Sequence, residues 1–185
     1  MKDMFKVNTR TIVATGIGAA LFILLFMYVK VPSPVPETQF QTAYGLGGFF
    51  ATLFGPIAGA LIQFIGHALS DAVQYGSPWW SWVIASGVAG FAFGFAFKRT
   101  KVEEGSFKGK DILTFNAIQA IGNLVAWVLV APVLDILIYA EPVNLVFTQG
   151  ITAALMNIVS TGVFGTLLLI AYAATRTQKG SLKKS

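Results

Sequence analysis

TIVATGIGAALFILLFMYV, residues 11–29, contains no charged side chain. A helix of this length spans roughly 28 Å, close to the thickness of the hydrocarbon core of a bilayer. The run ends in Tyr28-Val29-Lys30-Val31-Pro32, which lacks the small-residue cleavage site of a signal peptide. We therefore expect a retained membrane span, with the basic residues that precede it on the cytoplasmic side.

The composition of the whole chain is typical of a membrane protein. Of its 185 residues, 55% are hydrophobic and 11% are charged, whereas about 25% of residues are charged in an average soluble domain. This composition excludes an ordinary cytosolic enzyme, a disordered protein and a disulfide-stapled secreted domain. The absence of cysteine also excludes thiolate catalysis, Cys-ligated zinc and iron–sulfur clusters. We expect one polytopic membrane domain over residues 1–175, followed by a basic cytoplasmic tail over residues 176–185.

The positions of the Lys and Arg residues predict the topology. They cluster in the N-terminal segment, in a loop over residues 98–110 and in the C-terminal tail, and such clusters mark the cytoplasmic side. The proline-rich segment 32–36 predicts a stiff, extended loop on the outer side. The apolar sequence between these two loops is too long for one crossing, so three crossings are expected. Breaks at Gly55-Pro56 and at Gly76-Ser77-Pro78 divide it.

The sequence therefore predicts an all-α bundle of six transmembrane helices with both termini in the cytoplasm. This topology places 12 of the 13 Lys and Arg residues inside and only Lys30 outside. The second span is the weakest, because it is short and rich in glycine. The expected spans are residues 11–29, 40–54, 56–75, 82–97, 112–138 and 145–174.

Catalysis and metal binding are not expected. The segment from Gly105 to Asp111 has three residues between its glycines and Asp after the lysine, so it does not match a phosphate-binding loop. Ser86 lies in Ile84-Ala85-Ser86-Gly87, which lacks the glycine two positions before the serine that is expected of rhomboid-type intramembrane proteases, so no nucleophile–base pair is supported. His67 is the only histidine, which does not suffice for a transition-metal cage. No basic face is interleaved with aromatic residues, so nucleic-acid binding is not expected either.

Polar side chains inside the spans mark a candidate binding site. Gln63, His67 and Asp71 follow one another at intervals of four residues and share one helix face, in the outer half of the third span. Such a stripe is either a hydrogen-bonded seam between helices or the polar wall of an outward-facing pocket. Further polar positions in the fifth and sixth spans would line the same cavity, except that a packing or interface role is favoured where the fifth-span stripe reaches the cytoplasmic end: Asn116, Gln119, Asn123, Trp127, Asp135, Gln149, Thr152, Asn157 and Ser160.

Aromatic residues gather at the outer boundary. Tyr75, Trp79, Trp80 and Trp82 directly follow the polar stripe. They form either an interfacial aromatic belt or the flat walls of a pocket for a large ring ligand. Acidic residues outnumber the single lysine on this side, so a neutral or zwitterionic ligand is favoured over a strongly anionic one. The substrate-binding candidates are Gln63, His67, Asp71, Tyr75, Trp79, Trp80, Asn123 and Trp127.

Small residues in the first span predict close helix contact. Ala14 with Gly18, and Gly16 with Ala20, are both pairs of small residues four apart. Such a ridge serves either packing inside the bundle or contact with another subunit.

These features together resemble a known family. The segments 54–71 and 75–87, with Thr15-Gly-Ile-Gly-Ala-Ala-Leu21, are similar to the UPF0397 subfamily of S components, the substrate-binding subunits of energy-coupling factor (ECF) transporters. The chain resembles cobalamin-specific members in particular. The resemblance covers nearly the whole chain, although the motifs themselves cover about a third of it.

The resemblance implies a function and partners. An S component binds a vitamin from the outer side, associates with a transmembrane coupling protein and two ATPase subunits that use ATP, and topples in the membrane to carry the ligand inward. The small-residue ridge, Ala14, Gly16, Gly18 and Ala20, would contact the coupling protein, and the loop at residues 32–36 would act as a lid. Other vitamins, a methionine-pathway precursor, a self-contained transporter and a structural membrane subunit remain as alternatives.

Overall fold

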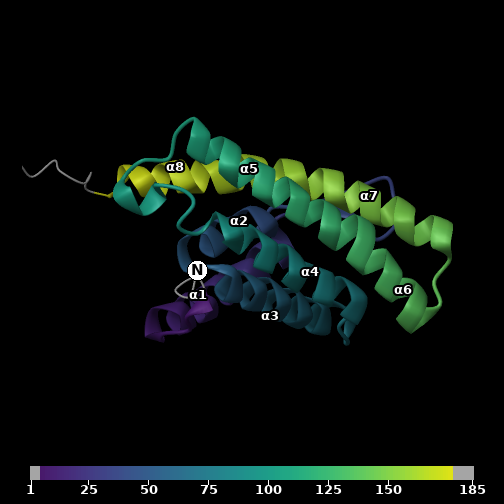
Figure 1. Ribbon diagram of the computed structural model, residues 1–185. Coiled ribbons are helices and arrows are strands. Elements are labelled where there is room, and N and C mark those ends of the chain that lie inside the picture. Colours follow the sequence, from purple (N-terminus) through teal and green to yellow (C-terminus); the bar gives the residue numbers. More distant parts are fainter. Residues whose placement is uncertain (1–4, 177–185) are drawn as a thin grey trace, which may run out of the picture.

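The computed structural model describes residues 5–176 and consists almost entirely of helices (Figure 1). The tail predicted from residue 176 onward therefore lies outside the described residues, except for Arg176 itself. The first four helices are α1 (Thr9–Tyr28), α2 (Ala43–Phe54), α3 (Pro56–Tyr75) and α4 (Trp80–Phe93), and the short 3₁₀ turn η2 (Gly94–Ala96) extends α4. A second 3₁₀ turn, η3 (Val102–Glu104), lies in the basic loop. The all-α class predicted from the sequence is confirmed.

Two long helical rods complete the fold. The first consists of α5 (Lys110–Asn123), the π-helical segment η4 (Leu124–Val130) and α6 (Ala131–Tyr139). The second consists of α7 (Val143–Ser160), the π-helical segment η5 (Thr161–Gly165) and α8 (Thr166–Ala174). The rods contact each other and run side by side, with α1 to α4 below them in the view of Figure 1.

The six helical units match the six predicted ranges closely. Four of them are long and apolar enough to cross a membrane: α1, α3 and the two rods. The other two, Ala43–Phe54 and Trp80–Ala96, are shorter apolar helices. Gly55 has a φ of 91° and ends α2, and Pro56 begins α3 immediately afterwards, so the break expected at this dipeptide is confirmed.

A small hairpin replaces the simple extended loop expected after the first span. Strands β1 (Lys30–Pro32) and β2 (Gln39–Gln41) pair antiparallel, with Lys30 opposite Gln41 and Pro32 opposite Gln39. Because each strand has only one neighbour, Pro32 is tolerated at a strand end. Three-residue strands are too short to produce a periodic pattern, which is why the sequence did not predict them.

Close backbone contact holds α3 against α4. A Cβ atom placed on Gly59 would lie 2.2 Å from the carbonyl oxygen of Gly90, and one placed on Gly90 would lie 2.1 Å from that of Gly59. Neither glycine leaves room for a methyl group. The same helix α3 also packs tightly on α1, where the ring of Phe22 covers Gly66.

Most of the basic residues lie at one end of the helix bundle. Arg10 at the start of α1 forms a 2.8 Å ion pair with Glu103 in the loop between α4 and α5, and α8 contacts the same loop. Within residues 5–176, Lys30, the first residue of the hairpin, is the one basic residue at the other end. The remaining basic residues in this range lie at the end that carries the Arg10–Glu103 ion pair: Lys6, Arg10, Lys98, Arg99, Lys101, Lys108, Lys110 and Arg176.

Candidate functional site

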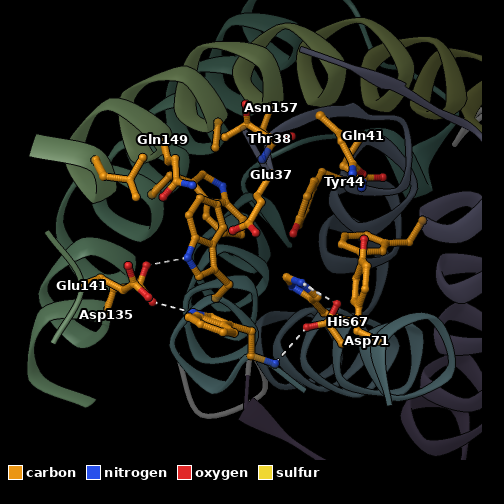
Figure 2. A pocket seen from close by; sticks show the side chains of 18 of the residues that line it. Glu37, Thr38, Gln41, Tyr44, His67, Asp71, Asp135, Glu141, Gln149 and Asn157 are labelled. Carbon is orange, nitrogen blue, oxygen red and sulfur yellow. Dashed lines mark hydrogen bonds and ion pairs between the residues drawn. The ribbon is translucent and has the colours of Figure 1, made fainter. Parts of the chain in front are cut away.

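A cavity of about 520 Å³ lies at the end of the bundle opposite the basic residues. Its volume falls in the range of roughly 300–1,000 Å³ that is typical of small-molecule sites. Figure 2 shows His67 and Asp71 on one side of it, Asp135 and Glu141 on another, and Gln149 and Asn157 on a third. The residues that line it are Phe26, Glu37, Thr38, Gln39, Gln41, Tyr44, His67, Asp71, Tyr75, Ser77, Trp79, Trp82, Trp127, Asp135, Glu141, Leu145, Gln149, Ala153 and Asn157.

Three buried polar atoms in the cavity wall have no hydrogen-bond partner among the described residues. They are Nδ1 of His67, Oε1 of Gln41 and Oδ1 of Asn157, and they come from α3, β2 and α7 respectively. A buried polar group that lacks a partner costs about 1–3 kcal/mol. Three such atoms around one cavity are therefore explained best by a ligand that supplies the missing partners.

Aromatic side chains line much of the cavity. The indole ring of Trp127 lies 5.3 Å from the ring of Tyr44 and 5.4 Å from that of Trp82. The hydroxyl groups of Tyr44 and Ser86 share a hydrogen bond of 3.2 Å. The ring of Phe26 lies 6.2 Å from that of Tyr44 and 4.5 Å from that of His67. Flat apolar surfaces with a few polar groups between them suit a ring-shaped ligand.

The electrostatic character of the cavity is acidic. Glu37, Asp71, Asp135 and Glu141 all line it, and no lysine or arginine within residues 5–176 does so. Lys30 lies nearby, and its Nζ donates a 2.7 Å hydrogen bond to Oε1 of Gln74. Burial lowers the pKa of the Lys30 ammonium, while the Asp71 carboxylate opposes this shift. The site therefore offers acceptors rather than fixed positive charge.

The hairpin covers part of the cavity and is attached to α7. The side-chain amide of Gln149 donates to the carbonyl oxygen of Pro36 at 3.1 Å, and Ser160 Oγ donates to the carbonyl oxygen of Gln41 at 2.5 Å. Gln39 and Gln41 alternate with Phe40, so their side chains share the face that lines the cavity. Sequence reasoning missed these hairpin positions, because three alternating residues are too few to form a recognisable pattern.

Five of the eight candidate residues line the cavity: His67, Asp71, Tyr75, Trp79 and Trp127. Gln63 does not, because its buried side chain lies between Gly47 of α2 and Gly90 of α4. Trp80 points away from the cavity, is 46% exposed and has its ring 6.2 Å from that of Phe64.

Asn123 lies behind the cavity wall and supports Trp127. Its Oδ1 accepts a 3.0 Å hydrogen bond from Nε1 of Trp127, and its Nδ2 donates to Oε1 of Gln119 at 2.9 Å. Gln119 Nε2 donates to Oδ1 of Asn116 at 3.3 Å, and Asn116 Nδ2 donates to Oγ1 of Thr166 in the second rod at 3.0 Å. This polar ladder connects the cavity wall to the half of the bundle that carries the basic residues.

The two small-residue pairs of α1 have different surroundings. Ala14 and Gly18 are buried inside the bundle, and a Cβ on Gly18 would lie 2.6 Å from Cδ1 of Ile62. Gly16 and Ala20 are exposed, and a Cβ on Gly16 would meet nothing within 4 Å. The outward-facing surface of α1 therefore includes Gly16 and Ala20 and excludes Ala14 and Gly18, because the chain itself covers the latter pair.

Comparisons with known proteins agree with this architecture. Residues 6–174 match the family model described as "ECF-type riboflavin transporter, S component". A UPF0397 protein of an Exiguobacterium species is 55% identical, over 98% of this chain and 99% of the relative. UPF0397 proteins of Lacticaseibacillus casei and Enterococcus faecalis are 50% and 51% identical, over 100% and 97% of this chain and 99% and 98% of their own lengths. The chain therefore belongs to the ECF-type transporter S-component family, a family of transport subunits and not of enzymes, and is a multi-pass protein of the bacterial cell membrane.

Proposed function

We propose that this chain captures a ring-shaped vitamin at the outer face of the membrane and delivers it inward as the substrate-binding subunit of an ECF transporter. In this proposal the chain crosses the membrane six times, with both termini in the cytoplasm. The first candidate ligand is cobalamin, which the sequence resemblance favours. The partners are a transmembrane coupling protein and two ATPase subunits.

One observation carries this proposal: three buried, unpartnered polar atoms face a cavity with aromatic walls. His67 Nδ1, Gln41 Oε1 and Asn157 Oδ1 come from three separate elements, and each needs a partner that the described residues do not supply. The amide atoms of Gln63, which lies between α2 and α4 and not in the cavity wall, also lack partners. The three cavity atoms differ from these because a molecule in the cavity can reach them. A bound ligand satisfies them from the cavity, and this is the interpretation that we adopt.

The charge distribution supports an outward-facing cavity. The described basic residues gather at one end of the bundle, and the cavity opens at the other end beside Lys30. Basic loops mark the cytoplasmic side of a membrane protein. We therefore orient the cavity toward the outside, where the hairpin acts as its lid.

The chemistry of the cavity favours a ligand that carries hydrogen-bond donors and no net negative charge. Cobalamin meets this requirement, because primary amide groups surround its corrin ring. Riboflavin is the second candidate, since the matching family model carries that name and its single fused ring system suits a cavity of about 520 Å³. Cobalamin is considerably larger, so part of it would project from the mouth beneath the hairpin.

Direct titration tests the proposal and distinguishes the two ligands. We expect the purified chain to bind cobalamin in calorimetry, with riboflavin and methionine as comparison ligands. Binding of riboflavin alone would keep the S-component function and replace the ligand. If none of the three binds, both candidate vitamins are wrong for this cavity.

We expect uptake to require the partner subunits. Vesicles that contain the complete complex and internal ATP should accumulate labelled cobalamin, whereas vesicles that contain this chain alone should not, because the chain has no phosphate-binding loop. ATP-dependent accumulation by the chain alone would show that it is a self-contained transporter.

His67 provides the sharpest test of the polar wall. Replacing His67 with alanine removes one unpartnered atom from the cavity, and we expect it to weaken ligand binding by about 1–3 kcal/mol, the usual effect of removing a buried hydrogen-bond partner. The matched control is Ser70→Ala on the same helix, because the Ser70 side chain is buried and its hydroxyl donates to the backbone oxygen of Gly66 rather than facing the cavity. Equal affinities of the two variants in calorimetry would return the stripe on α3 to a packing role.

A further inference from the structure

Asp135 on α6 holds the first turn of α4 through three side-chain hydrogen bonds. Its Oδ1 accepts from Nε1 of Trp79 at 2.7 Å and from Oγ of Ser81, and its Oδ2 accepts from Nε1 of Trp82 at 2.7 Å. Figure 2 shows two of these bonds as dashed lines from Asp135 at the edge of the cavity. The residue is only 2% exposed. Both carboxylate oxygens are therefore engaged, and each one holds a different indole.

The same turn is held from the opposite side by α3. Asp71 Oδ2 accepts a 3.1 Å hydrogen bond from the backbone amide of Trp79. Trp79 thus bridges two buried carboxylates, with its backbone bound to one and its indole to the other. Tyr139, one turn after Asp135, places its ring 4.3 Å from that of Trp79 and accepts a hydrogen bond from the backbone amide of Trp80 at 3.1 Å.

Burying the Asp135 carboxylate costs free energy, which indicates that the carboxylate has a specific role. A carboxylate at membrane depth loses its hydration, and here only neutral groups, two indole N–H groups and one hydroxyl, replace it. Packing α4 against α6 would need no charge at this position. What the carboxylate provides is two acceptor oxygens that fix the planes of two rings, and both rings line the cavity.

We propose that Asp135 is the positioning residue that holds Trp79 and Trp82 as the flat walls of the ligand cavity. This inference rests on the proposed function, because the walls matter only if a ring-shaped ligand lies between them. A carboxylate is required at this position. Asparagine has one acceptor oxygen, so its amide group would face one of the indole N–H donors and release that ring.

The test begins with the ligand-free protein. Asp135→Asn is expected to change the near-ultraviolet circular dichroism of the tryptophans and to increase their quenching by acrylamide. The matched control is Asp111→Asn, which makes the same chemical change at the opposite end of the bundle, where Asp111 accepts from the backbone amide of Lys101. Identical tryptophan signals in Asp135→Asn and wild type would overturn the proposal, whatever the ligand.

Ligand titration then tests whether Asp135 acts through the indoles. With cobalamin and riboflavin as probes, Asp135→Asn should weaken the binding of whichever probe the wild type binds by about tenfold or more. In a Trp79→Phe/Trp82→Phe background the same substitution should change affinity by less than about threefold, because its targets are already absent. A full tenfold loss in that background would show that Asp135 contacts the ligand itself or only maintains the fold.

Two further variants keep the inference testable if Asp135→Asn does not fold. Trp79→Phe and Trp82→Phe each remove one N–H donor and keep a flat ring, so each should reproduce part of the loss in affinity. Full affinity in both would overturn the positioning role. If the wild type binds neither probe while the tryptophan signals of Asp135→Asn still change, both candidate ligands fail and the structural role of Asp135 in the ligand-free protein stands.

Discussion

Replacing Gly90 with alanine is expected to lower the apparent midpoint of thermal unfolding by about 10 °C, the result of an overpacking cost of about 3 kcal/mol. The added methyl group would lie 2.1 Å from the backbone oxygen of Gly59, far inside van der Waals contact. A flexible side chain could move aside, but a backbone oxygen moves only if α3 moves. Helix α3 is itself held by α1 on its other side, where Phe22 covers Gly66. The measurement is tryptophan fluorescence of the detergent-purified protein during heating.

Gly16→Ala is the matched control for this substitution. It makes the same chemical change within a helix, but nothing lies within 4 Å of the added atom. Alanine has a higher helix propensity than glycine by about 1 kcal/mol, so the control should keep or raise the midpoint. Equal unfolding midpoints of Gly90→Ala and Gly16→Ala would contradict the close backbone contact between α3 and α4.

Gly16→Trp and Ala20→Trp are together expected to abolish assembly with the coupling protein and to leave ligand binding intact. Both positions are exposed on α1, next to apolar side chains that also face outward. Small residues four apart allow a second helix to approach closely, and an indole at either position would hold that helix away. The measurements are co-purification with the coupling protein and calorimetry on the solitary variant.

Leu137→Trp is the control for this second substitution. Leu137 lies on α6, is 74% exposed and tests whether a bulky ring on any outward-facing surface prevents assembly. We expect the control variant to assemble normally. Assembly of the Gly16→Trp/Ala20→Trp variant at wild-type levels would mean that this face of α1 meets lipid rather than a partner.

The helices could be predicted well from the sequence, because the length of an apolar run, its hydropathy and its Gly-Pro breaks are all properties of neighbouring residues. Gly55-Pro56 ends one helix and begins the next regardless of tertiary context. The hairpin could not be predicted in the same way, because three-residue strands depend on contacts made far along the chain. Gln149 and Ser160, more than 110 residues away from their backbone partners, hold it in place.

For the candidate site, the sequence could predict only which face of α3 carries it and how far along that helix it lies. The interval of four residues correctly placed His67 and Asp71 on one side of α3, and both line the cavity. The same interval placed Gln63 on this face, but Gln63 lies one helical turn farther from the cavity. Its neighbours there are Gly47 and Gly90, which have no side chains and so leave room for the Gln63 amide between the helices. Asp135 was recognised as polar, yet its bonds to Trp79 and Trp82 join residues more than 50 positions apart, and periodicity carries no information about such pairs.

The π-helical segment Leu124–Val130 makes the α5–η4–α6 rod sensitive to the loss of a single residue. The amide of Ala131 donates to the carbonyl oxygen of Ala126, five residues back, so the segment holds one residue more than an α-helical turn would. Losing that residue would turn the part of the rod with Asn116, Gln119 and Asn123 by about 100° relative to Asp135. The ladder behind Trp127 would then face lipid while the indole wall stayed in place. A one-residue deletion here, which would be neutral in many surface loops, would uncouple the two ends of the rod.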